Sequence, residues 1–237
     1  MNQTLKAWAI AAAISFGPSI LVIGETPVPR FLVRTELDLV AGLPSPPAAG
    51  SLAAAADLEA VLQAQAWRTP ESVAWAKAVD EGKVWDNAEV LGSWFKEGQL
   101  PQLARFFRGI GKEFRPVCLA AKKSFDRPRP FMIDGRIQPC LPLPTDTSFP
   151  SGHASYFFME AEVLAEIFPE ARKALLEHAH KAAWGRILAG VHFPTDTVAG
   201  RLLAQAFVGE IKKSRAFQKG IEACRAEAAP FRLKKAG

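Results

Sequence analysis

Two short segments of the chain carry side chains suited to phosphoryl transfer. One is 150–153, Pro-Ser-Gly-His, and the other runs from Arg186 through His192 to Asp196. His192 is the candidate nucleophile, because Asp196, four residues later, can hold its other ring nitrogen and stabilise the positive charge that forms with a phosphorus–nitrogen bond. His153 is the candidate general acid, which protonates the leaving alcohol and later acts as the base that activates water.

A phosphoryl group also needs positive partners for its oxygens. Lys122, Arg129 and Arg186 are the candidates, because arginine donates two parallel hydrogen bonds to phosphate and lysine adds a compact charge. Ser151 and Gly152 stand at the expected start of a helix, where a hydroxyl and free backbone N–H groups can face the same anion.

The elements that position these residues are predicted to be helices. The chain has 237 residues, 49% of them hydrophobic, which is enough for one core and one domain. Alanine, leucine and glutamate are common and β-branched runs are scarce, so the sequence favours helix over strand. We expect an all-α, single-domain helical bundle.

Capping residues, prolines and apolar spacing indicate where these helices lie. The expected starts are Ser51 as N-cap of a helix over 53–65, Thr69 as N-cap of the next, and further starts near Asp86, Pro101 and Pro116. A buried helix is expected over 155–168, another from Pro169 to about Ala189, and one that begins at 193–194 with Val198, Leu202 and Phe207 facing inward.

The first fifty residues predict export. A lysine at position 6 precedes an apolar stretch, so 1–24 is expected to be either a signal peptide or an uncleaved membrane anchor. The prolines of 43–50 predict an extended linker over 25–50, which leaves 51–237 as the catalytic domain. Glutamates interrupt the later apolar run of 157–168, so the catalytic domain is expected to be water-soluble. The expected location is the periplasm, with or without an N-terminal membrane anchor.

The net charge of +5 is consistent with small anionic substrates. We expect no nucleic-acid partner, because acidic residues are interleaved and no nucleic-acid motif or long basic run is present. Of the three cysteines, Cys118 and Cys140 are expected to form a disulfide that braces the first motif. The cysteine spacing is not a metal signature, and neither a metal nor another cofactor is expected.

Together these segments resemble the acid phosphatase and haloperoxidase superfamily, also called the type 2 phosphatidic acid phosphatase family. Its pattern is Lys-x6-Arg-Pro, then Pro-Ser-Gly-His, then Ser-Arg-x5-His-x3-Asp. The residues at 122–130, 150–153 and 186–196 match these three parts in order, except that Gly185 replaces the serine of the third. That glycine removes one hydroxyl contact and leaves the charged and acid–base groups in place.

Residues 43–51 and 164–170 are also similar to bacterial class A non-specific acid phosphatases. That resemblance implies a helical bundle, a metal-free phosphohistidine mechanism, broad use of phosphomonoesters at acidic pH, a periplasmic address and often a homo-oligomer. The chain departs from the class at 147–154, where Thr-Ser-Phe precedes the Pro-Ser-Gly-His motif and Ala154 follows it. The subclass and substrate range therefore stay open.

Three other functions fit the same residues. A vanadium-dependent haloperoxidase would hold vanadate in the same site, a membrane-associated lipid phosphate or pyrophosphate phosphatase would retain the N-terminal anchor, and a pure binding protein would hold a phosphorylated ligand without turnover. His178 and His180 are interpreted as structural or solvated histidines. Arg127 is expected to support the site from behind, and Asp126 to pair with a nearby arginine.

Overall fold

The computed structural model describes residues 31–32 and 35–233, and every regular element in that part of the chain is a helix. The α-helices are α1 (Glu36–Val40), α2 (Leu52–Ala66), α3 (Pro70–Ala78), α4 (Ala88–Leu91), α5 (Pro101–Phe125), α6 (Pro130–Ile133), α7 (Gly152–Ile167), α8 (Arg172–Leu188), α9 (Pro194–Ile211) and α10 (Arg215–Leu233). Short 3-10 helices lie at η1 (Val84–Asn87), η2 (Glu97–Gln99) and η3 (Pro169–Ala171). The all-α prediction is confirmed.

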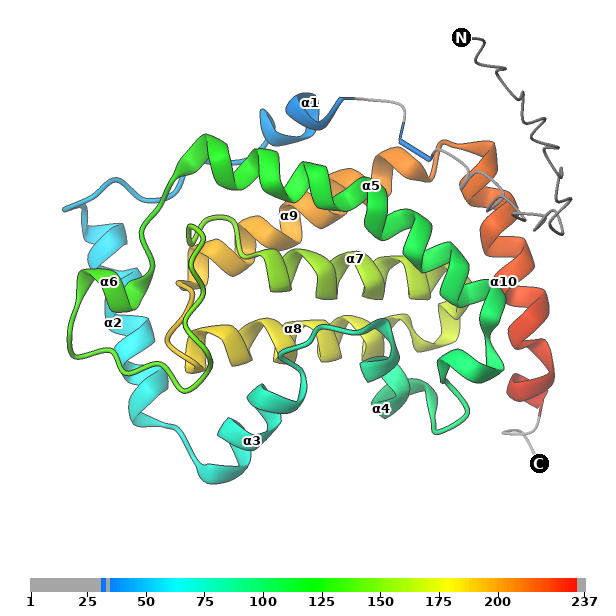
Figure 1. The fold of residues 1–237 in the computed structure, drawn as a ribbon, viewed down its shortest axis with the longest axis horizontal. Coiled ribbons are helices and arrows are strands. Elements are labelled where there is room, and N and C mark those ends of the chain that lie inside the picture. Colours follow the sequence, from blue (N-terminus) through cyan, green and yellow to red (C-terminus); the bar gives the residue numbers. More distant parts are fainter. Residues whose placement is uncertain (1–30, 33–34, 234–237) are drawn as a thin grey trace, which may run out of the picture.

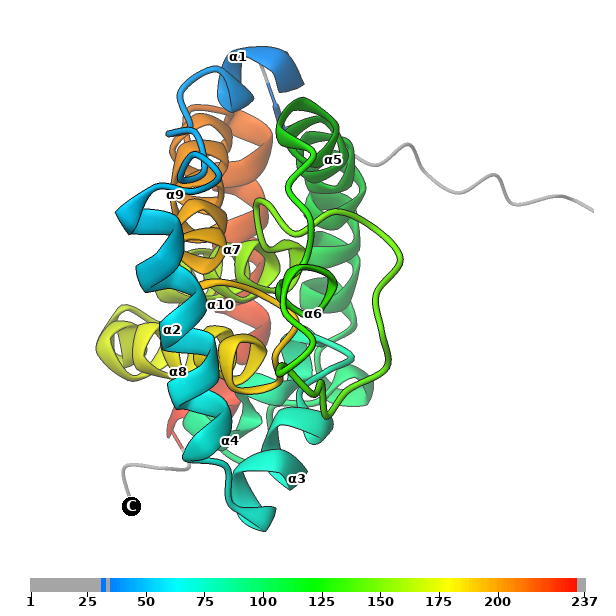
Figure 2. The ribbon, with the colours of Figure 1, turned by 90° about the vertical axis from the view of Figure 1, so that its left-hand side faces the viewer.

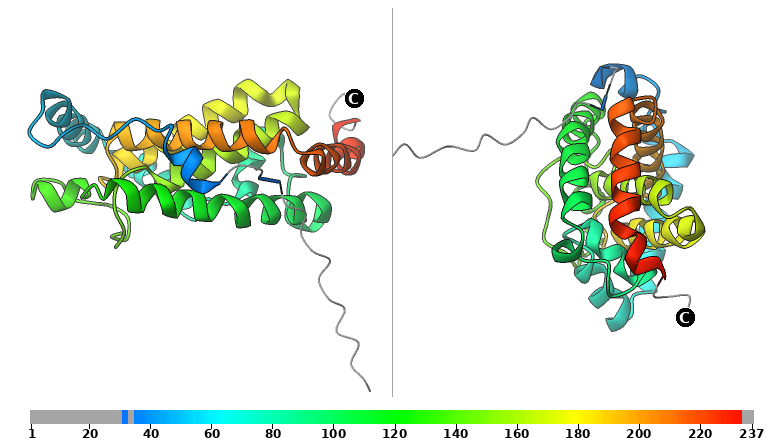
Figure 3. Two further views of the ribbon diagram at one scale, coloured as in Figure 1. Left: turned by 90° about the horizontal axis from the view of Figure 1, so that it is seen from above. Right: turned by 90° about the vertical axis from the view of Figure 1, so that its right-hand side faces the viewer.

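Helix α7 lies at the centre of the bundle, with α5, α8 and α9 beside it (Figure 1). It is buried along almost its whole length, including the glutamates Glu160 and Glu162. The carboxyl ends of α5 and α8 and the amino ends of α7 and α9 lie at the same end of the bundle, which Figure 2 shows end-on. Helix α10 lies across the opposite end (Figure 3). The bundle therefore brings four helix termini together at one end.

Helices α7 and α9 approach most closely at Gly200. A Cβ atom built there would lie 2.7 Å from the carbonyl oxygen of Ser151 and 3.0 Å from the backbone nitrogen of Ser155. Both contacts are to backbone, which cannot rotate away. Glycine at this position therefore lets α9 lie directly against the first turn of α7.

Replacing this glycine is expected to push the two helices apart. Gly200→Ala should lower the free energy of unfolding by about 1–3 kcal/mol, because a methyl group would overpack the contact. Activity should fall with it, since Ser151 moves. Gly209→Ala is the matched control on the same helix, where nothing lies within 4 Å, and it should raise stability by about 0.5–1 kcal/mol. Urea denaturation of both variants measures the difference, and equal stabilities would contradict the close approach.

The predicted helix starts agree with the structure at Ser51 and Thr69. The Ser51 side chain accepts a hydrogen bond from the backbone N–H of Ala54, and Thr69 and Ser72 form a reciprocal capping box. The start predicted at Pro116 is wrong, because α5 continues through that proline. Pro116 lies on the exposed face of α5, where water can bind the carbonyl that loses its partner.

The inward face of α9 differs from the prediction at two positions. Phe207 is fully buried as expected, whereas Val198 is 57% and Leu202 is 38% exposed. The buried face instead includes Ala199 and Leu203, each one residue further along. Small residues occupy this face because α9 packs so closely against α7.

The N-terminal predictions are tested only in part. The predicted signal or anchor, 1–24, lies outside the described residues. The expected extended linker contains the short helix α1, and Phe31, Leu39 and Val40 are buried in the main core. Burial of these side chains ties this segment to the bundle, so it is not wholly an extended linker. Among the described helices, none combines the length and hydrophobicity that a membrane span requires.

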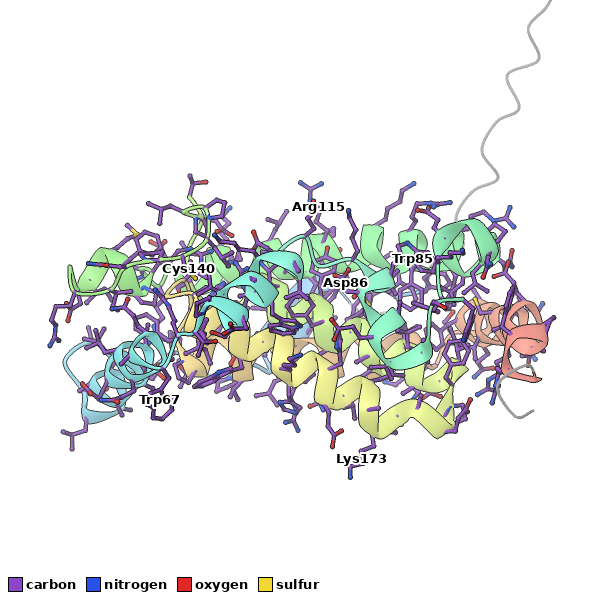
Figure 4. All side chains as sticks on the ribbon, turned by 90° about the horizontal axis from the view of Figure 1, so that it is seen from below. Trp67, Trp85, Asp86, Arg115, Cys140 and Lys173 are labelled. Atoms are coloured by element: carbon purple, nitrogen blue, oxygen red, sulfur yellow. The ribbon has the colours of Figure 1, made fainter. Side chains whose placement is uncertain are left out.

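The predicted disulfide is wrong, because Cys118 and Cys140 are both free thiols. Cys118 lies in the main core on α5, where burial raises the pKa of its thiol to about 12. Cys140 lies in the loop after α6, and its backbone N–H donates to the carbonyl of Ala189. Figure 4 shows Cys140 toward the end of the molecule that carries α6. The two cysteines thus pack into separate clusters, and the backbone hydrogen bond braces the loop instead.

Candidate active site

The predicted site residues come from the four helix termini that meet at one end of the bundle, except Arg129, which is the N-cap of α6. Lys122 lies in the last turn of α5 and Arg186 in the last turn of α8. Gly190 adopts a φ of 77°, which L side chains rarely adopt, and this turn leads the chain directly to His192. Asp196 lies in the first turn of α9.

His192 is held by a carboxylate on one side and a guanidinium on the other. Its Nδ1 lies 3.3 Å from Oδ2 of Asp196, and its Nε2 lies 3.2 Å from Nη1 of Arg129. A guanidinium can only donate, so we assign the proton of the neutral ring to Nδ1 and the free lone pair to Nε2. Nε2 therefore carries the lone pair of this ring, which accepts the hydrogen bond from Arg129.

Burial and neighbouring charge determine the protonation of this pair. Burial lowers the pKa of His192 to about 3, and the charges of Arg129 and Lys122 act in the same direction against the opposing effect of Asp196. Burial alone would raise the pKa of Asp196, yet its hydrogen bond to His192 and the charges around it hold that pKa below its usual value. The resting pair is thus a neutral imidazole beside a carboxylate.

Asp196 receives several further hydrogen bonds that fix its position. Ser148 donates its hydroxyl to Oδ2 at 2.5 Å, the backbone N–H of Phe193 donates to the same oxygen at 2.8 Å, and Arg127 donates to Oδ1 at 2.7 Å. The carboxylate is fully buried. These bonds hold the carboxylate, and through it the ring, in one orientation.

Arg129 and Lys122 both pair with the carboxylate of Asp146. Nη2 of Arg129 lies 2.5 Å from Oδ1 of Asp146, and Nζ of Lys122 lies 3.0 Å from its Oδ2. Arg129 also donates to the carbonyl of Val191 at 2.7 Å, which orients the guanidinium. Asp146 is half exposed, whereas Arg129 and Lys122 are largely buried.

Asp80 links the second histidine to the third cation. The carboxylate of Asp80 pairs with Nη1 of Arg186, and its main-chain carbonyl lies 2.9 Å from Nε2 of His153. Burial, together with the charges of Arg186 and Arg129, lowers the pKa of His153 to about 4 against the opposing effect of Asp80. His153 therefore lies within electrostatic reach of Arg186 and of Arg129, the arginine that contacts His192.

One nitrogen of the cationic cluster has no partner in the described part of the chain. Nε of Arg186 is buried without a hydrogen bond, although the residue is only 3% exposed. Such a buried donor costs free energy unless a ligand accepts its hydrogen bond. The missing acceptor is consistent with an anion that binds at Arg186.

Ser151 and Gly152 occupy the amino end of α7 beside this cluster. Ser151 is the N-cap, and its hydroxyl accepts from the backbone N–H of Ala154 at 3.3 Å. A Cβ atom at Gly152 would lie 3.6 Å from Cε of Lys122, so the first turn of α7 lies against the lysine stem. The structure thus brings all eight predicted site residues to one end of the bundle.

The sequence analysis missed three acidic residues of the site, namely Asp57, Asp80 and Asp146. None of them belongs to a motif, so residue type is their only signal. Asp57 and Asp80 come from distant parts of the chain, whereas Asp146 lies four residues before Pro150. Arg127 was expected to support the site, and it does contact Asp196. Asp126, expected to pair with an arginine, instead ends α5 with a φ of 40°, and no ion pair to an arginine is found for it among the described residues.

Gly185, the departure from the family pattern, has a structural explanation. A Cβ atom at this position would lie 3.1 Å from the Trp75 ring of α3. That aromatic ring therefore occupies the space where a serine would stand.

Removing the charge of Asp146 should strengthen the binding of anions by Arg129 and Lys122. In Asp146→Asn, phosphate no longer competes with a negative charge for Arg129 and Lys122, so we expect the inhibition constant of inorganic phosphate to fall about 3- to 10-fold. Asp134→Asn on the same loop is the control, since Asp134 pairs with Arg136 instead. Competitive inhibition assays measure both, and weaker phosphate binding in Asp146→Asn would show that the carboxylate orients the cations.

Acid should destabilise the ligand-free protein. Both histidine pKa values are lowered by folding, from 6.5 to about 3 for His192 and about 4 for His153. The unfolded chain therefore binds protons first as the pH falls, and the stability present above pH 6.5 is lost toward pH 3. We expect Tm to drop by at least about 5 °C between pH 7 and pH 4. Calorimetry with and without phosphate tests this, and a Tm that stays constant would contradict it.

The chain is similar to known phosphatases in sequence and fold. Residues 113–218 match the model of the PAP2 superfamily. The non-specific acid phosphatase of Providencia stuartii is 27% identical over 83% of both chains, and that of Salmonella typhi is 32% identical over 46% of this chain and 45% of its own. An acid phosphatase of Zymomonas mobilis is 27% identical over 66% of this chain and 63% of its own.

A solved structure shares the fold. It is described as the first transmembrane PAP2 type phosphatidylglycerolphosphate phosphatase from Bacillus subtilis, with a TM-score of 0.51 and 20% identity over 75% of this chain and 90% of that chain. The family match covers the last part of α5 and all of α6 to α9, the elements that carry Lys122, His153 and His192. Residues 113–218 therefore match the PAP2 superfamily, and the chain as a whole is similar to non-specific acid phosphatases.

Proposed function

We propose that the protein hydrolyses phosphomonoesters through a phosphohistidine formed on Nε2 of His192. The unpartnered, buried Nε of Arg186 carries this proposal, because it marks a missing anion in a cluster of cations. Arg129 links that cluster to the nucleophile, since it contacts His192 and also lowers the pKa of Arg186 by its charge. A bound phosphate would thus meet both the cations and the free lone pair of the ring.

In the first step, Nε2 of His192 attacks phosphorus with its lone pair and the bond to the ester oxygen breaks. Arg129, Arg186 and Lys122 stabilise the charge on the remaining oxygens, and the backbone N–H groups at the start of α7 add further donors. Protonated His153 gives its proton to the leaving oxygen. The ring of His192 keeps its Nδ1 proton, becomes positive and is stabilised by Asp196.

In the second step, water attacks the phosphohistidine. Neutral His153 accepts a proton from this water, and the phosphorus–nitrogen bond breaks with its electron pair returning to Nε2. Inorganic phosphate then leaves. The lowered pKa of His153, about 4, supports acidic conditions for the first step, because the free enzyme holds the required proton only at low pH.

A cavity beside α7 supports a broad substrate range. It measures about 310 Å³ and is lined mainly by apolar side chains, among them Trp85, Phe107, Tyr156 and Met159. Tyr156 lies one helical turn beyond His153 on α7, and Figure 4 labels Trp85 on the opposing element η1. We assign the organic group of the ester to the side of α7 that carries this cavity, because the leaving oxygen must face His153. The apolar part of this lining accepts many shapes, and Lys83, Glu97, Arg108 and Glu160 add charged groups to the cavity.

We further propose export to the periplasm and assembly into a homo-oligomer. The apolar N-terminal sequence, with one lysine before it, supports export as a signal peptide or an uncleaved anchor. The oligomer rests on the family resemblance alone. Fractionation of expressing cells and light scattering of the purified protein test these two points.

The phosphoenzyme itself is the decisive test of the mechanism. Rapid acid quenching destroys an N-phosphorylated histidine, so turnover should be stopped in base, with p-nitrophenyl phosphate as substrate. We expect a phosphate label that is stable to base, labile to acid and located on the peptide that contains His192. Turnover without any such label would reject the phosphohistidine mechanism, and a label stable to acid would reject histidine as the nucleophile.

A further inference from the structure

A buried charge cluster extends from the nucleophile toward α2. Arg127 forms ion pairs with two carboxylates, donating from Nη1 to Oδ1 of Asp196 and from Nη2 to Oδ2 of Asp57, both at 2.7 Å. The three side chains are at most 8% exposed. Asp57 lies on α2, outside the segment that matches the family model.

Thr195 joins this cluster at the start of α9. Its hydroxyl accepts a hydrogen bond from Nη1 of Arg127 at 2.8 Å and donates to Oδ2 of Asp57. Its backbone N–H lies 3.2 Å from Oδ1 of Asp57. Arg127 also lies over the ring of Phe193, 3.9 Å from its centre. These contacts fix Asp57 relative to the loop that carries His192.

The sum of the charges changes with the state of His192. In the resting enzyme, two carboxylates and one guanidinium give the cluster a charge of minus one next to a neutral ring. After phosphoryl transfer, the ring carries a positive charge and the sum becomes zero. Without Asp57, Arg127 would neutralise Asp196, and the positive ring would lack a balancing charge in a buried setting.

We propose that Asp57 is a positioning residue of the nucleophile, which acts through Arg127 and supplies the negative charge that balances phosphorylated His192. This rests on the proposed phosphohistidine chemistry. The bond changes stay those of the first step, since Asp57 neither gains nor loses a proton. Its effect is electrostatic and falls on phosphoryl transfer, not on the binding of phosphate by Arg129, Lys122 and Arg186.

The first variant removes the charge and keeps the shape. In Asp57→Asn, the side-chain oxygen can still accept from Arg127 and Thr195. We expect the single-turnover rate of phosphorylation to fall about tenfold or more, which corresponds to about 1.4 kcal/mol of lost stabilisation. The inhibition constant of inorganic phosphate should stay within about twofold of wild type, because the cations that bind it are unchanged. Glu59→Gln, an exposed substitution on the same helix, is the matched control and should leave both values unchanged.

A second variant separates charge from structure. The double variant Asp57→Asn/Arg127→Gln removes one negative and one positive charge, which restores the cluster to minus one. We expect its phosphorylation rate to exceed that of Asp57→Asn, although two ion pairs are lost. A purely structural role predicts the reverse order, so a double variant slower than the single variant would overturn the proposal.

The remaining outcomes are also decisive. A phosphorylation rate in Asp57→Asn within twofold of wild type, with a phosphoenzyme present in both, overturns the role of Asp57 and leaves the proposed function intact. If the wild-type enzyme turns over without forming a phosphoenzyme, the role of Asp57 and the proposed phosphohistidine mechanism are both overturned. Far-UV circular dichroism and Tm show whether each variant is folded, and an unfolded Asp57→Asn would also contradict the proposal, since the amide should preserve the packing.

Discussion

His192→Ala is expected to abolish hydrolysis of p-nitrophenyl phosphate, with kcat reduced by roughly 10^4-fold or more. The substitution removes the atom that forms the new bond to phosphorus. No other described side chain stands ready to replace it, because the nearest nitrogens belong to Arg129 and Lys122 and carry no free lone pair. Steady-state kinetics and the base-quenched phosphoenzyme assay measure the loss.

The cation cluster should survive this substitution. Inorganic phosphate should therefore still bind His192→Ala, and a Tm raised by added phosphate would show it. His180→Ala on α8 is the control, since that ring is exposed, packs on Phe158 and should leave kcat unchanged within about twofold. Wild-type rates in His192→Ala would remove the basis for the whole mechanism.

His153→Ala has the second largest expected effect, and it should depend on the leaving group. We expect kcat/KM to fall by about 10²- to 10⁴-fold for alkyl phosphates, because their alkoxide leaves poorly without a proton. For p-nitrophenyl phosphate the rate of phosphorylation should fall much less, since p-nitrophenolate leaves well without being protonated. A series of aryl and alkyl phosphates in single-turnover assays measures this slope.

The second step gives an independent check on His153. If the ring also activates water, the phosphoenzyme should accumulate in His153→Ala with p-nitrophenyl phosphate, because it forms but decays slowly. His178→Ala is the control on the neighbouring helix α8. Equal losses for good and poor leaving groups would show that His153 shapes the site without donating a proton.

Local sequence determined most of the helices, including the helix ends that carry site residues. Ser51 and Thr69 start their helices by bonding backbone N–H groups within three residues, an interaction that needs no tertiary contact. The helix start predicted at Pro116 was wrong because the effect of this proline depends on tertiary contacts. Its effect on a helix depends on whether the freed carbonyl meets water or protein, and that is decided by the packing of α5.

Side chains within one motif could be paired from sequence because only a few residues separate them and a helix start follows His192 directly. His192 and Asp196 are four residues apart, and the turn that opens α9 brings them to 3.3 Å. The partners of Arg127, Arg129 and Arg186 could not be found in this way. Asp57, Asp146 and Asp80 lie on other segments, and a lone aspartate carries no local signal of its partner.

The sequence by itself therefore determined an all-helical protein with a phosphoryl-transfer motif, because residue type and short spacing already specify helices, caps and the His192–Asp196 pair. Only the tertiary structure decided which carboxylates balance the cations, that Cys118 and Cys140 remain apart, and which face of α9 is buried. These features depend on distances between segments far apart along the chain. Such distances are set by how α7 packs against α5, α8 and α9, which no local pattern of residues records.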